Sequence, residues 1–345
     1  MSAAFARELA ELRPGDEDRF GGKSANLGAL LAAGVRVPAG FALSTDAFAA
    51  FMTDGLEDRV RDAFAGLDPT DVAALAAAAE EIGAALRATP IPRVVRSEIE
   101  RRHAALGPHA AVAVRSSARG EDAADATFAG QQETFLWVRG IDAVAEAIRD
   151  CWASLYSAPA ISYRGRLGAA DAPPAMGVTV QLMVDAAVAG VLFTRSPVSG
   201  DPSVVAVDAS WGLGIGVVGG EVTPDEYVVS KITGEVLRRT IGRKLVRFEP
   251  AADGGTIAVP VAPEEQEAAC LDDAQLGALA DLGVRIERHA GSAQDVEWAI
   301  ARGTGEILVL QARPVTAAPR GARVVGGSAL SMVMGAFGAR PPEPS

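Results

Sequence analysis

Residues 111–138 bring together side chains suited to binding a polyphosphate. An alternating apolar run over 111–114 is typical of a half-buried strand, and it leads to Arg115, Ser116 and Ser117 at its end. An arginine binds phosphate oxygens in a fork, because its N–H groups diverge in one plane. On these residues alone, a polyphosphate site and a solvated surface hairpin are both open interpretations.

The loop after Ser117 adds further polar groups. Its acidic residues are Glu121, Asp122 and Asp125. Beyond them stand one glycine and three side chains that donate hydrogen bonds: Gly130, Gln131, Gln132 and Thr134. Because glycine has no side chain, we expect the backbone at Gly130 to approach a ligand closely.

Residues 294–316 carry a second chemical cluster. Two alternating apolar and polar runs flank the sequence Gly-Thr-Gly at 303–305, which predicts a β-hairpin. If the turn is centred on Thr304, Glu297 lies opposite Gln311 and Asp295 lies opposite Arg313, all on one face. The opposite face then holds four other residues: Val296, Trp298, Leu310 and Ala312.

The polar face of this predicted hairpin fits a hard cation. Mg²⁺ binds carboxylate and carbonyl oxygens and keeps positions for phosphate and water. Glu297 and Gln311 supply such oxygens, and Arg313 beside them can neutralise charge on a transferred phosphoryl group. The same pattern also permits a plain ion pair between Asp295 and Arg313 on a solvated face.

The sequence Gly-Gly-Lys-Ser at 21–24 precedes a predicted helix over 24–33, which Gly34 closes as a C-cap. The N-terminus of a helix favours anions, so Lys23 is a candidate phosphate ligand. A Walker A loop is excluded, because it requires a glycine where this chain has Glu17. An ordinary loop and helix cap is the alternative.

A Gly-x-Gly-x-x-Gly pattern occupies 214–219, downstream of a predicted strand over 204–207. A dinucleotide site would need a long helix to begin there. The glycines at 219 and 220, with Pro224, oppose such a helix, so we reject this interpretation.

The remaining segments supply the framework. Residues 46–106 are helical in pattern, with an amphipathic segment over 70–87. A further helix over 141–163 is expected to place three side chains in a core: Trp152, Leu155 and Tyr156. Residues 168–174 indicate a linker. Strands are then expected at 175–183 and 188–193, on either side of a turn at 184–186, and a helix over 272–289.

Composition excludes several classes of protein. The chain has 345 residues, of which 49% are hydrophobic, and a net charge of −12, which argues against nucleic acid or an anionic membrane as a partner. Cys151 and Cys270 form no metal-binding or disulfide pattern. Because no signal peptide or spanning segment is apparent, we expect a soluble, cytoplasmic protein.

Four stretches together resemble one family. They are VRSSARGEDAADATFAGQQETF at 114–135, GGKSANLGALLAAGVRVPAGF at 21–41, the segment 209–227, and the DVEW and QARP sequences of the hairpin. They are very similar to the N-terminal ATP-grasp part of phosphoenolpyruvate synthase, pyruvate phosphate dikinase and rifampin phosphotransferase. The resemblance covers about residues 20–316 and implies an α+β, two-lobed ATP-grasp fold with the nucleotide between the lobes. We expect lobes at 1–170 and 171–316 and a Gly/Pro-rich tail at 317–345, a possible docking segment with Leu330, Met332 and Met334 as its anchors.

The resemblance also implies roles for single residues. Lys23 falls on the family's ATP-phosphate lysine, and Glu297 and Gln311 fall on its metal ligands. Residues 181–184 fall on the adenine-binding hinge. The implied catalytic residues are Lys23, Arg115 and Arg313. The implied nucleotide-binding set also includes Gly130, Gln131, Gln132, Thr134, Gln181, Met183, Val184, Glu297 and Gln311.

The implied activity is phosphoryl transfer from ATP, with Mg²⁺, to a histidine on a partner subunit, with release of AMP and phosphate. The acceptor downstream would be a small molecule such as a phenol or pyruvate. His103, His109 and His289 lie outside a Gly-rich phosphoacceptor context and are expected at the surface. A natural subunit, like that of phenylphosphate synthase, and an excised domain are both open, and the initial Met favours the former. The rival functions are an ATP-grasp carboxylate–amine ligase and a non-catalytic ATP-sensing module.

Overall fold

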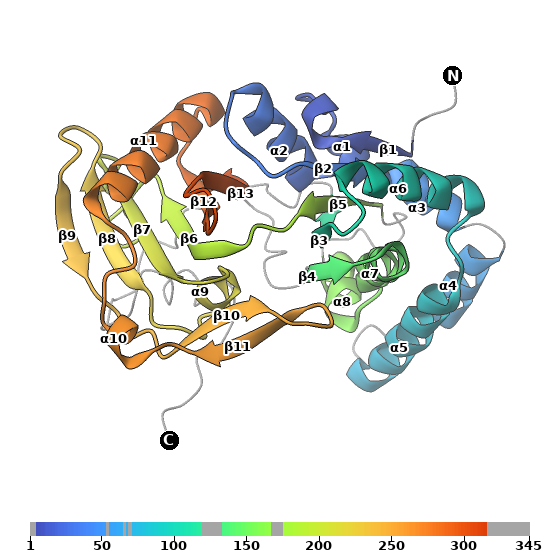
Figure 1. The fold of residues 1–345 in the computed structure, drawn as a ribbon. Coiled ribbons are helices and arrows are strands. Elements are labelled where there is room, and N and C mark those ends of the chain that lie inside the picture. Colours follow the sequence, from blue (N-terminus) through green and yellow to red (C-terminus); the bar gives the residue numbers. More distant parts are fainter. Residues whose placement is uncertain are drawn as a thin grey trace. The chain divides into compact units, whose positions relative to one another are not determined.

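The computed structural model describes residues 5–52, 55–64, 67, 71–118, 133–166 and 175–315. These residues form two compact units (Figure 1). Unit 1 contains the described residues of 5–28, 39–118 and 133–183, and unit 2 contains Ala29–Pro38 and the described residues from Val184 onwards. Each unit has its own antiparallel sheet, which confirms the α+β class with two lobes. No helix in the described ranges is long and apolar enough to cross a membrane.

The sheet of unit 1 has five antiparallel strands. Their order is β1 (Ala6–Glu8), β2 (Gly40–Leu43), β5 (Met176–Leu182), β3 (Ala111–Ala118) and β4 (Thr134–Arg139). The strand expected over 111–114 continues to Ala118, so Arg115 to Ser117 lie within β3 rather than after it. β5 lies beyond residue 170, yet it pairs with β2 and β3. In sequence, the chain passes from unit 1 to unit 2 between Met183 and Val184, which is later than the expected boundary at residue 170.

Helices surround this sheet. They are α1 (Glu17–Phe20), α2 (Gly22–Ala32), α3 (Thr45–Phe51), α4 (Leu56–Phe64), α5 (Val72–Ala88), α6 (Arg93–Leu106), α7 (Ile141–Ser154) and α8 (Ala158–Arg166), with a 3-10 turn, η1, at Leu9–Glu11. The expected helices over 24–33 and 70–87 correspond to α2 and α5. Asp71 caps α5 by accepting a hydrogen bond from the Ala74 N–H at 2.9 Å. The helix expected over 141–163 is interrupted at Leu155 and divided into α7 and α8.

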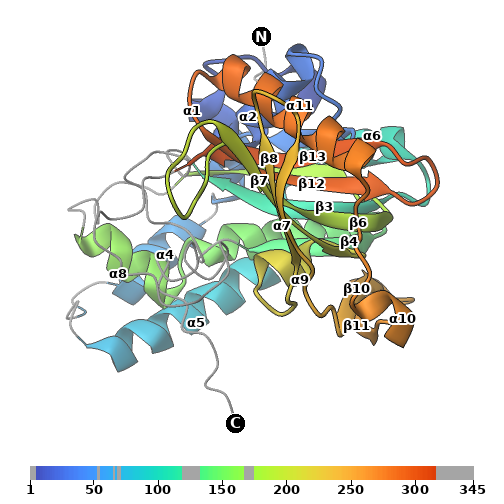
Figure 2. The same ribbon diagram turned by 90° about the vertical axis from the view of Figure 1, so that its left-hand side faces the viewer.

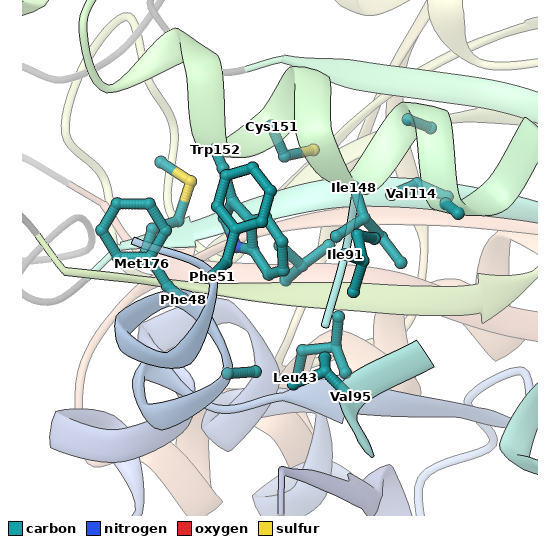
Figure 3. Packing of buried hydrophobic residues seen from close by; sticks show 14 of the residues in the cluster. Leu43, Phe48, Phe51, Ile91, Val95, Val114, Ile148, Cys151, Trp152 and Met176 are labelled. Atoms are coloured by element: carbon teal, nitrogen blue, oxygen red, sulfur yellow. The ribbon is translucent and has the colours of Figure 1, made fainter. Parts of the chain in front are cut away.

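The core of unit 1 is built around Trp152 of α7 (Figure 3). The Trp152 ring lies 4.7 Å from Phe51 and 5.9 Å from Phe48, both on α3, between ring centroids. Leu155 and Tyr156 are buried, as expected. Alternation along the strands sends one set of side chains into this core, including Val114. The alternate side chains point to the opposite face of the sheet and are therefore available to form a site.

The sheet of unit 2 has six antiparallel strands. Their order is β13 (Ile307–Pro314), β12 (Gln294–Ala301), β6 (Ala186–Phe193), β7 (Val204–Trp211), β8 (Asp225–Ser230) and β9 (Val236–Thr240). α11 (Asp273–Ala290), the helix expected over 272–289, lies along one face (Figures 1 and 2). A Cβ added to Gly283 of α11 would lie 3.2 Å from Leu192 and 3.7 Å from Val205, so the helix rests closely on the sheet.

Smaller elements complete unit 2. They are α9 (Ile215–Val218), α10 (Pro263–Gln266) and the two-stranded hairpin of β10 (Val246–Pro250) and β11 (Thr256–Pro260). α9 is a single turn that ends at Gly219, which agrees with the rejection of a dinucleotide helix. β5 and β6 flank residues 184–186 as expected, but they belong to different sheets rather than to one hairpin.

Segment 29–38 is part of unit 2, although its neighbours in sequence belong to unit 1. It runs beside β13, the edge strand of the six-stranded sheet. The Val309 N–H donates to the Arg36 carbonyl at 2.9 Å, and Arg36 Nη1 lies 3.0 Å from Glu306 Oε1. This segment therefore occupies hydrogen-bonding capacity at the edge of the sheet.

A buried ion pair joins three parts of unit 2. Asp225 at the start of β8 and Lys244 before β10 are both fully buried and form a salt bridge. Asp225 Oδ1 also accepts from the Gly242 N–H at 3.0 Å. Its Oδ2 accepts from the Cys270 N–H at 2.9 Å and the Tyr227 hydroxyl at 3.1 Å. These bonds compensate the cost of burying the charges.

Candidate functional site

The face of the unit 1 sheet that points away from the core is polar. Val114 on β3 and Val180 on β5 enter the core, whereas Arg115 and Thr179 point to the opposite side and lie directly opposite each other. Gln181, two residues along β5, shares their face. All three side chains are buried, with Arg115 at 8% exposure. Alternation along β3 and β5 thus places a cation and two neutral polar groups on one face of the sheet.

The first turn of α2 lies against this polar face. The Ser24 N–H donates to Ser117 Oγ at 3.2 Å, and Ser24 Oγ lies 2.7 Å from Thr179 Oγ1. The Lys23 ammonium donates to the Ser116 carbonyl at 3.1 Å. The structure therefore brings Lys23 and the strand that carries Arg115 together within unit 1. The Ser24 amide is already occupied, which reduces the set of N–H groups expected to be open to an anion.

Gly21 makes this close contact possible. Its φ of +78° and ψ of 162° suit glycine, and a Cβ added there would lie 2.0 Å from the Ser117 carbonyl oxygen. A side chain at this position would push α2 away from β3. The glycine in the Gly-Gly-Lys-Ser sequence therefore sets the position of Lys23.

The expected adenine-binding residues take different positions. The Gln181 side chain is 1% exposed, and its Nε2 has no hydrogen-bond partner in the described part of the chain. The Met183 N–H already donates to the Ala111 carbonyl at 2.9 Å. Val184 is the first residue of unit 2 after β5. Gln181 is thus the one of these side chains with an unused buried donor.

The other residues expected in the nucleotide loop are less informative. Thr134 pairs with Arg115 across β3 and β4, and its side chain is exposed. Three further expected ligands, Gly130, Gln131 and Gln132, lie outside the described residues, as do the three acidic residues of the loop, the linker at 168–174 and the tail at 317–345.

The hairpin of β12 and β13 has the predicted register at its polar end. Glu297 lies opposite Gln311, and Asp295 lies opposite Arg313. A β-bulge then shifts the ladder, so that Trp298 pairs with Val309. Val309 rather than Leu310 therefore takes the buried position opposite Trp298, and the predicted apolar face was wrong at that residue.

Asp295 and Arg313 form the cross-strand ion pair that the sequence allowed. Arg313 Nε donates to Asp295 Oδ2 at 2.9 Å. Burial raises the pKa of Asp295, and Arg313 opposes that shift. Glu297 and Gln311 lie two residues further along the two strands, so this pair is the next one on the same face. An arginine that can contact an anion is thus oriented beside two oxygen ligands.

Two neighbouring carboxylates on this face were missed from the sequence. The strand register places Glu297, Val191, Asp208 and Glu226 directly opposite one another across β12, β6, β7 and β8. Asp208 is 2% exposed, and its Oδ2 has no partner among the described residues. Burial raises the pKa of Asp208 to about 7, with Glu226 and Asp295 acting in the same direction and Arg238 opposing. The available signal was an acidic residue inside the apolar run 204–209.

The histidines are not equivalent. His109 and His289 are exposed, as expected. His103 on α6 is buried at 7% exposure, and its Nε2 has no partner in the described ranges, so the surface position expected for it was wrong. Burial lowers the pKa of His103.

Comparison with known families identifies the chain's relatives. The model of the pyruvate phosphate dikinase AMP/ATP-binding domain matches residues 17–326. This chain belongs to that family. Pyruvate phosphate dikinase-type domains of this kind bind ATP, so the predicted family and the predicted nucleotide are confirmed.

Individual relatives of this dikinase family are much longer proteins. A probable phosphoenolpyruvate synthase of Methanothermobacter thermautotrophicus is 42% identical over 91% of this chain and 46% of the relative. Phosphoenolpyruvate synthase of Neisseria meningitidis is 41% identical over 92% and 42%. Rifampicin phosphotransferase of a Streptomyces species is 39% identical over 92% and 36%. The chain therefore spans less than half the length of each, and its relatives are phosphotransferases.

Proposed function

We propose that this chain is the ATP-binding module of a dikinase-type phosphotransferase. A histidine on a partner subunit attacks the β-phosphorus of ATP, and AMP leaves as the bond between the α-phosphate and β-phosphate breaks. The diphosphate on the histidine then loses its terminal phosphate to water as inorganic phosphate. The remaining phosphoryl group passes to a small acceptor such as a phenol or pyruvate.

The observation that carries this proposal is the paired geometry of the hairpin. Glu297 faces Gln311, and the neighbouring Arg313 is held by Asp295. Oxygen ligands for a metal ion and an arginine that stabilises charge recur at sites of phosphoryl transfer from ATP. Membership of the AMP/ATP-binding domain family supports ATP as the nucleotide.

Glu297 and Gln311 fit Mg²⁺. Both side chains present oxygens, and Mg²⁺ takes few protein ligands and completes its shell with phosphate and water. The described residues contain no group of three His, Cys, Asp or Glu side chains arranged for a metal, so a closed protein cage is not present in them. Bound there, Mg²⁺ would neutralise the charge of the phosphates.

The cationic side chains have complementary tasks. Lys23 is fixed at the start of α2 by the Ser116 carbonyl, and Arg115 lies on the neighbouring strand. Following the family resemblance, we assign Lys23 and Arg115 of unit 1, and separately Arg313 of unit 2, to phosphate binding. Fixed charges of this kind stabilise the charge that develops during transfer, and they need no reorganisation at that moment. None of them forms a covalent bond, so the chain contributes positioning and charge.

The acceptor histidine is assigned outside this chain. His103 lies on α6 and is buried at 7% exposure, and α6 contributes Val95 and Ile99 to the core of unit 1. The relatives extend well beyond the region that this chain matches. A histidine supplied by a partner subunit is consistent with both observations.

The test is nucleotide analysis with Mg²⁺ and ATP labelled at the β- and γ-phosphates. The reaction is run with and without a candidate histidine-bearing partner. We expect AMP and acid-labile label on the partner, and Lys23→Ala and Arg313→Ala to abolish both. Arg285→Ala on α11, an exposed arginine outside the polar faces, is the matched control and should retain activity.

Other outcomes would redirect the assignment. ADP formed without any partner would contradict the dikinase reaction and favour a carboxylate–amine ligase or a simple ATPase. ATP bound tightly without turnover, in the presence of a partner shown to be competent, would favour an ATP-sensing module.

A further inference from the structure

Three hydroxyl side chains that have no role in the proposed reaction meet at the first turn of α2. Ser24, Ser117 and Thr179 come from α2, β3 and β5, and all three are fully buried. The Ser24 N–H donates to Ser117 Oγ at 3.2 Å, and Ser24 Oγ lies 2.7 Å from Thr179 Oγ1. Burying a hydroxyl costs free energy unless it is hydrogen-bonded. The helix and the two strands therefore satisfy one another's polar groups at this point.

These hydroxyls adjoin both cations that unit 1 contributes to phosphate binding. Lys23 immediately precedes Ser24 on α2, and its ammonium donates to the Ser116 carbonyl at 3.1 Å. Arg115 lies on β3 directly opposite Thr179 on β5, and directly paired residues project to the same face of a sheet. The bonds made by Ser24 therefore hold the first turn of α2 against the two strands that carry Arg115 and Thr179.

Close backbone contacts bring this turn to the sheet, but they do not orient it. A Cβ added to Gly177 of β5 would lie 2.4 Å from the Phe20 carbonyl oxygen, just as a Cβ on Gly21 would collide with Ser117. Such contacts limit the distance between the backbones and leave a helix free to rotate about its axis. Hydrogen bonds are directional, so the bonds made by Ser24 restrict that rotation. A rotation would displace the ammonium of the preceding lysine.

We propose that Thr179 is a positioning residue for Lys23. Its hydrogen bond with Ser24 Oγ fixes the first turn of α2, and so fixes the spacing between the Lys23 ammonium and the Arg115 guanidinium. Cations held at a fixed spacing bind phosphate oxygens without reorganisation. Thr179 acts through Lys23 and forms no bond to the nucleotide. The inference rests on the proposed function, because that assigns Lys23 and Arg115 to phosphate.

The experiment is a double-mutant cycle that measures equilibrium binding of ATP in the presence of Mg²⁺. Thr179→Val removes the hydroxyl and keeps a branched side chain of similar shape. The loss of one neutral hydrogen bond corresponds to about 2-fold to 10-fold weaker affinity. We expect a loss in that range in the otherwise intact protein. In Lys23→Ala the same substitution should have no effect on affinity, because no ammonium remains to be positioned.

Two further variants keep the inference testable if Thr179→Val alone disturbs folding. Thr179→Ser retains the hydroxyl and should bind ATP as the intact protein does. Ser24→Ala removes the other hydroxyl of the pair, and its loss of affinity should match that of Thr179→Val without adding to it. Melting temperatures establish that each variant is folded.

Thr89→Val is the matched control, because the Thr89 hydroxyl donates to the Ala85 carbonyl at 2.8 Å elsewhere in unit 1. It should leave the affinity for ATP unchanged. If Thr179→Val has no effect, or weakens binding equally with and without Lys23, the inference is overturned while the proposed function stands. If Lys23→Ala binds ATP as tightly as the intact protein, the phosphate role of Lys23 is overturned, and the inference falls with it.

Discussion

At the scale of single residues, Gly21 and Gly34 differ in an instructive way. Both have positive φ, +78° and +73°. An added Cβ would collide with Ser117 at Gly21, whereas it would meet nothing within 4 Å at Gly34. The sequence shows that both residues are glycines. It does not show that Gly21 lies close to β3, because that contact depends on tertiary packing.

We therefore expect Gly21→Ala to be far more harmful than Gly34→Ala. Backbone strain alone costs about 1–3 kcal/mol at either site. Gly21→Ala adds displacement of α2, so its loss of unfolding free energy should exceed that of Gly34→Ala by about 2 kcal/mol or more. It should also weaken ATP binding, because Lys23 moves with the helix. Denaturant unfolding and nucleotide titration measure the two effects, and equal effects of the two substitutions would contradict this.

Asp208 gives a pH-dependent prediction. Its pKa is raised from 3.8 to about 7 by burial, so the folded state holds the proton more tightly than the unfolded state. The stabilising contribution of the protonated carboxyl is therefore present below about pH 4 and is lost as the pH rises to about 7. Asp208→Asn removes this titration. The unfolding free energy of the variant, minus that of the intact protein, should rise by up to about 4 kcal/mol across this window.

Denaturant unfolding at several pH values without nucleotide measures that difference. It should be constant above about pH 8, because the carboxyl is then ionised in both states. Glu264→Gln, an exposed carboxylate on α10, serves as the control and should show no comparable change. A difference for Asp208→Asn that does not vary with pH would show that this carboxyl titrates normally.

At the scale of elements, the Asp225–Lys244 pair holds β8 to the chain segments before β10 and α11. Both side chains are fully buried and Asp225 accepts from two backbone N–H groups. Asp225→Ala leaves the Lys244 ammonium and those N–H groups without their acceptor. We expect a loss of about 3–5 kcal/mol in unfolding free energy.

The partly exposed pair of Lys231 and Glu287 is the comparison. Glu287→Ala should cost about 1 kcal/mol or less, because solvent screens that pair. Replacing Asp225 and Lys244 together with apolar residues should cost less than Asp225→Ala alone, which a double-mutant comparison would establish. Equal losses for the fully buried and the partly exposed pair would contradict the role assigned to Asp225.

The hairpin shows what a sequence can and cannot fix at this scale. A short turn with glycines determines which residues face each other, so Glu297 and Gln311 were paired correctly. No sequence pattern marks the bulge after Glu297. Because of this bulge, Val309 rather than Leu310 lies opposite Trp298. Strand pairing between distant segments is less accessible still. The row from Glu297 to Asp208 depends on β6 lying between β12 and β7, which no local pattern specifies.

At the scale of the whole molecule, the helices and strands followed from periodicity and the α+β class from the family resemblance, whereas the boundary between the units followed from neither. The predicted boundary followed a polar, Pro-containing stretch, which is a local signal. The observed division depends on pairing: β5 joins the sheet of unit 1, and Ala29–Pro38 joins unit 2. Such pairings bring together residues far apart in sequence, so composition does not reveal them.

The path of the chain at Ala29–Pro38 also affects how the protein can be divided by recombinant expression. A fragment beginning at Val184 contains β13 but lacks the strip of backbone that receives the Val309 N–H. Its outermost strand would then offer unpaired N–H and C=O groups to any other copy. We expect this fragment to self-associate with rising concentration in light scattering, and to do so less when residues 29–38 are supplied as a peptide. We therefore expect a well-behaved fragment of unit 2 to require residues 29–38 in addition to the chain from Val184.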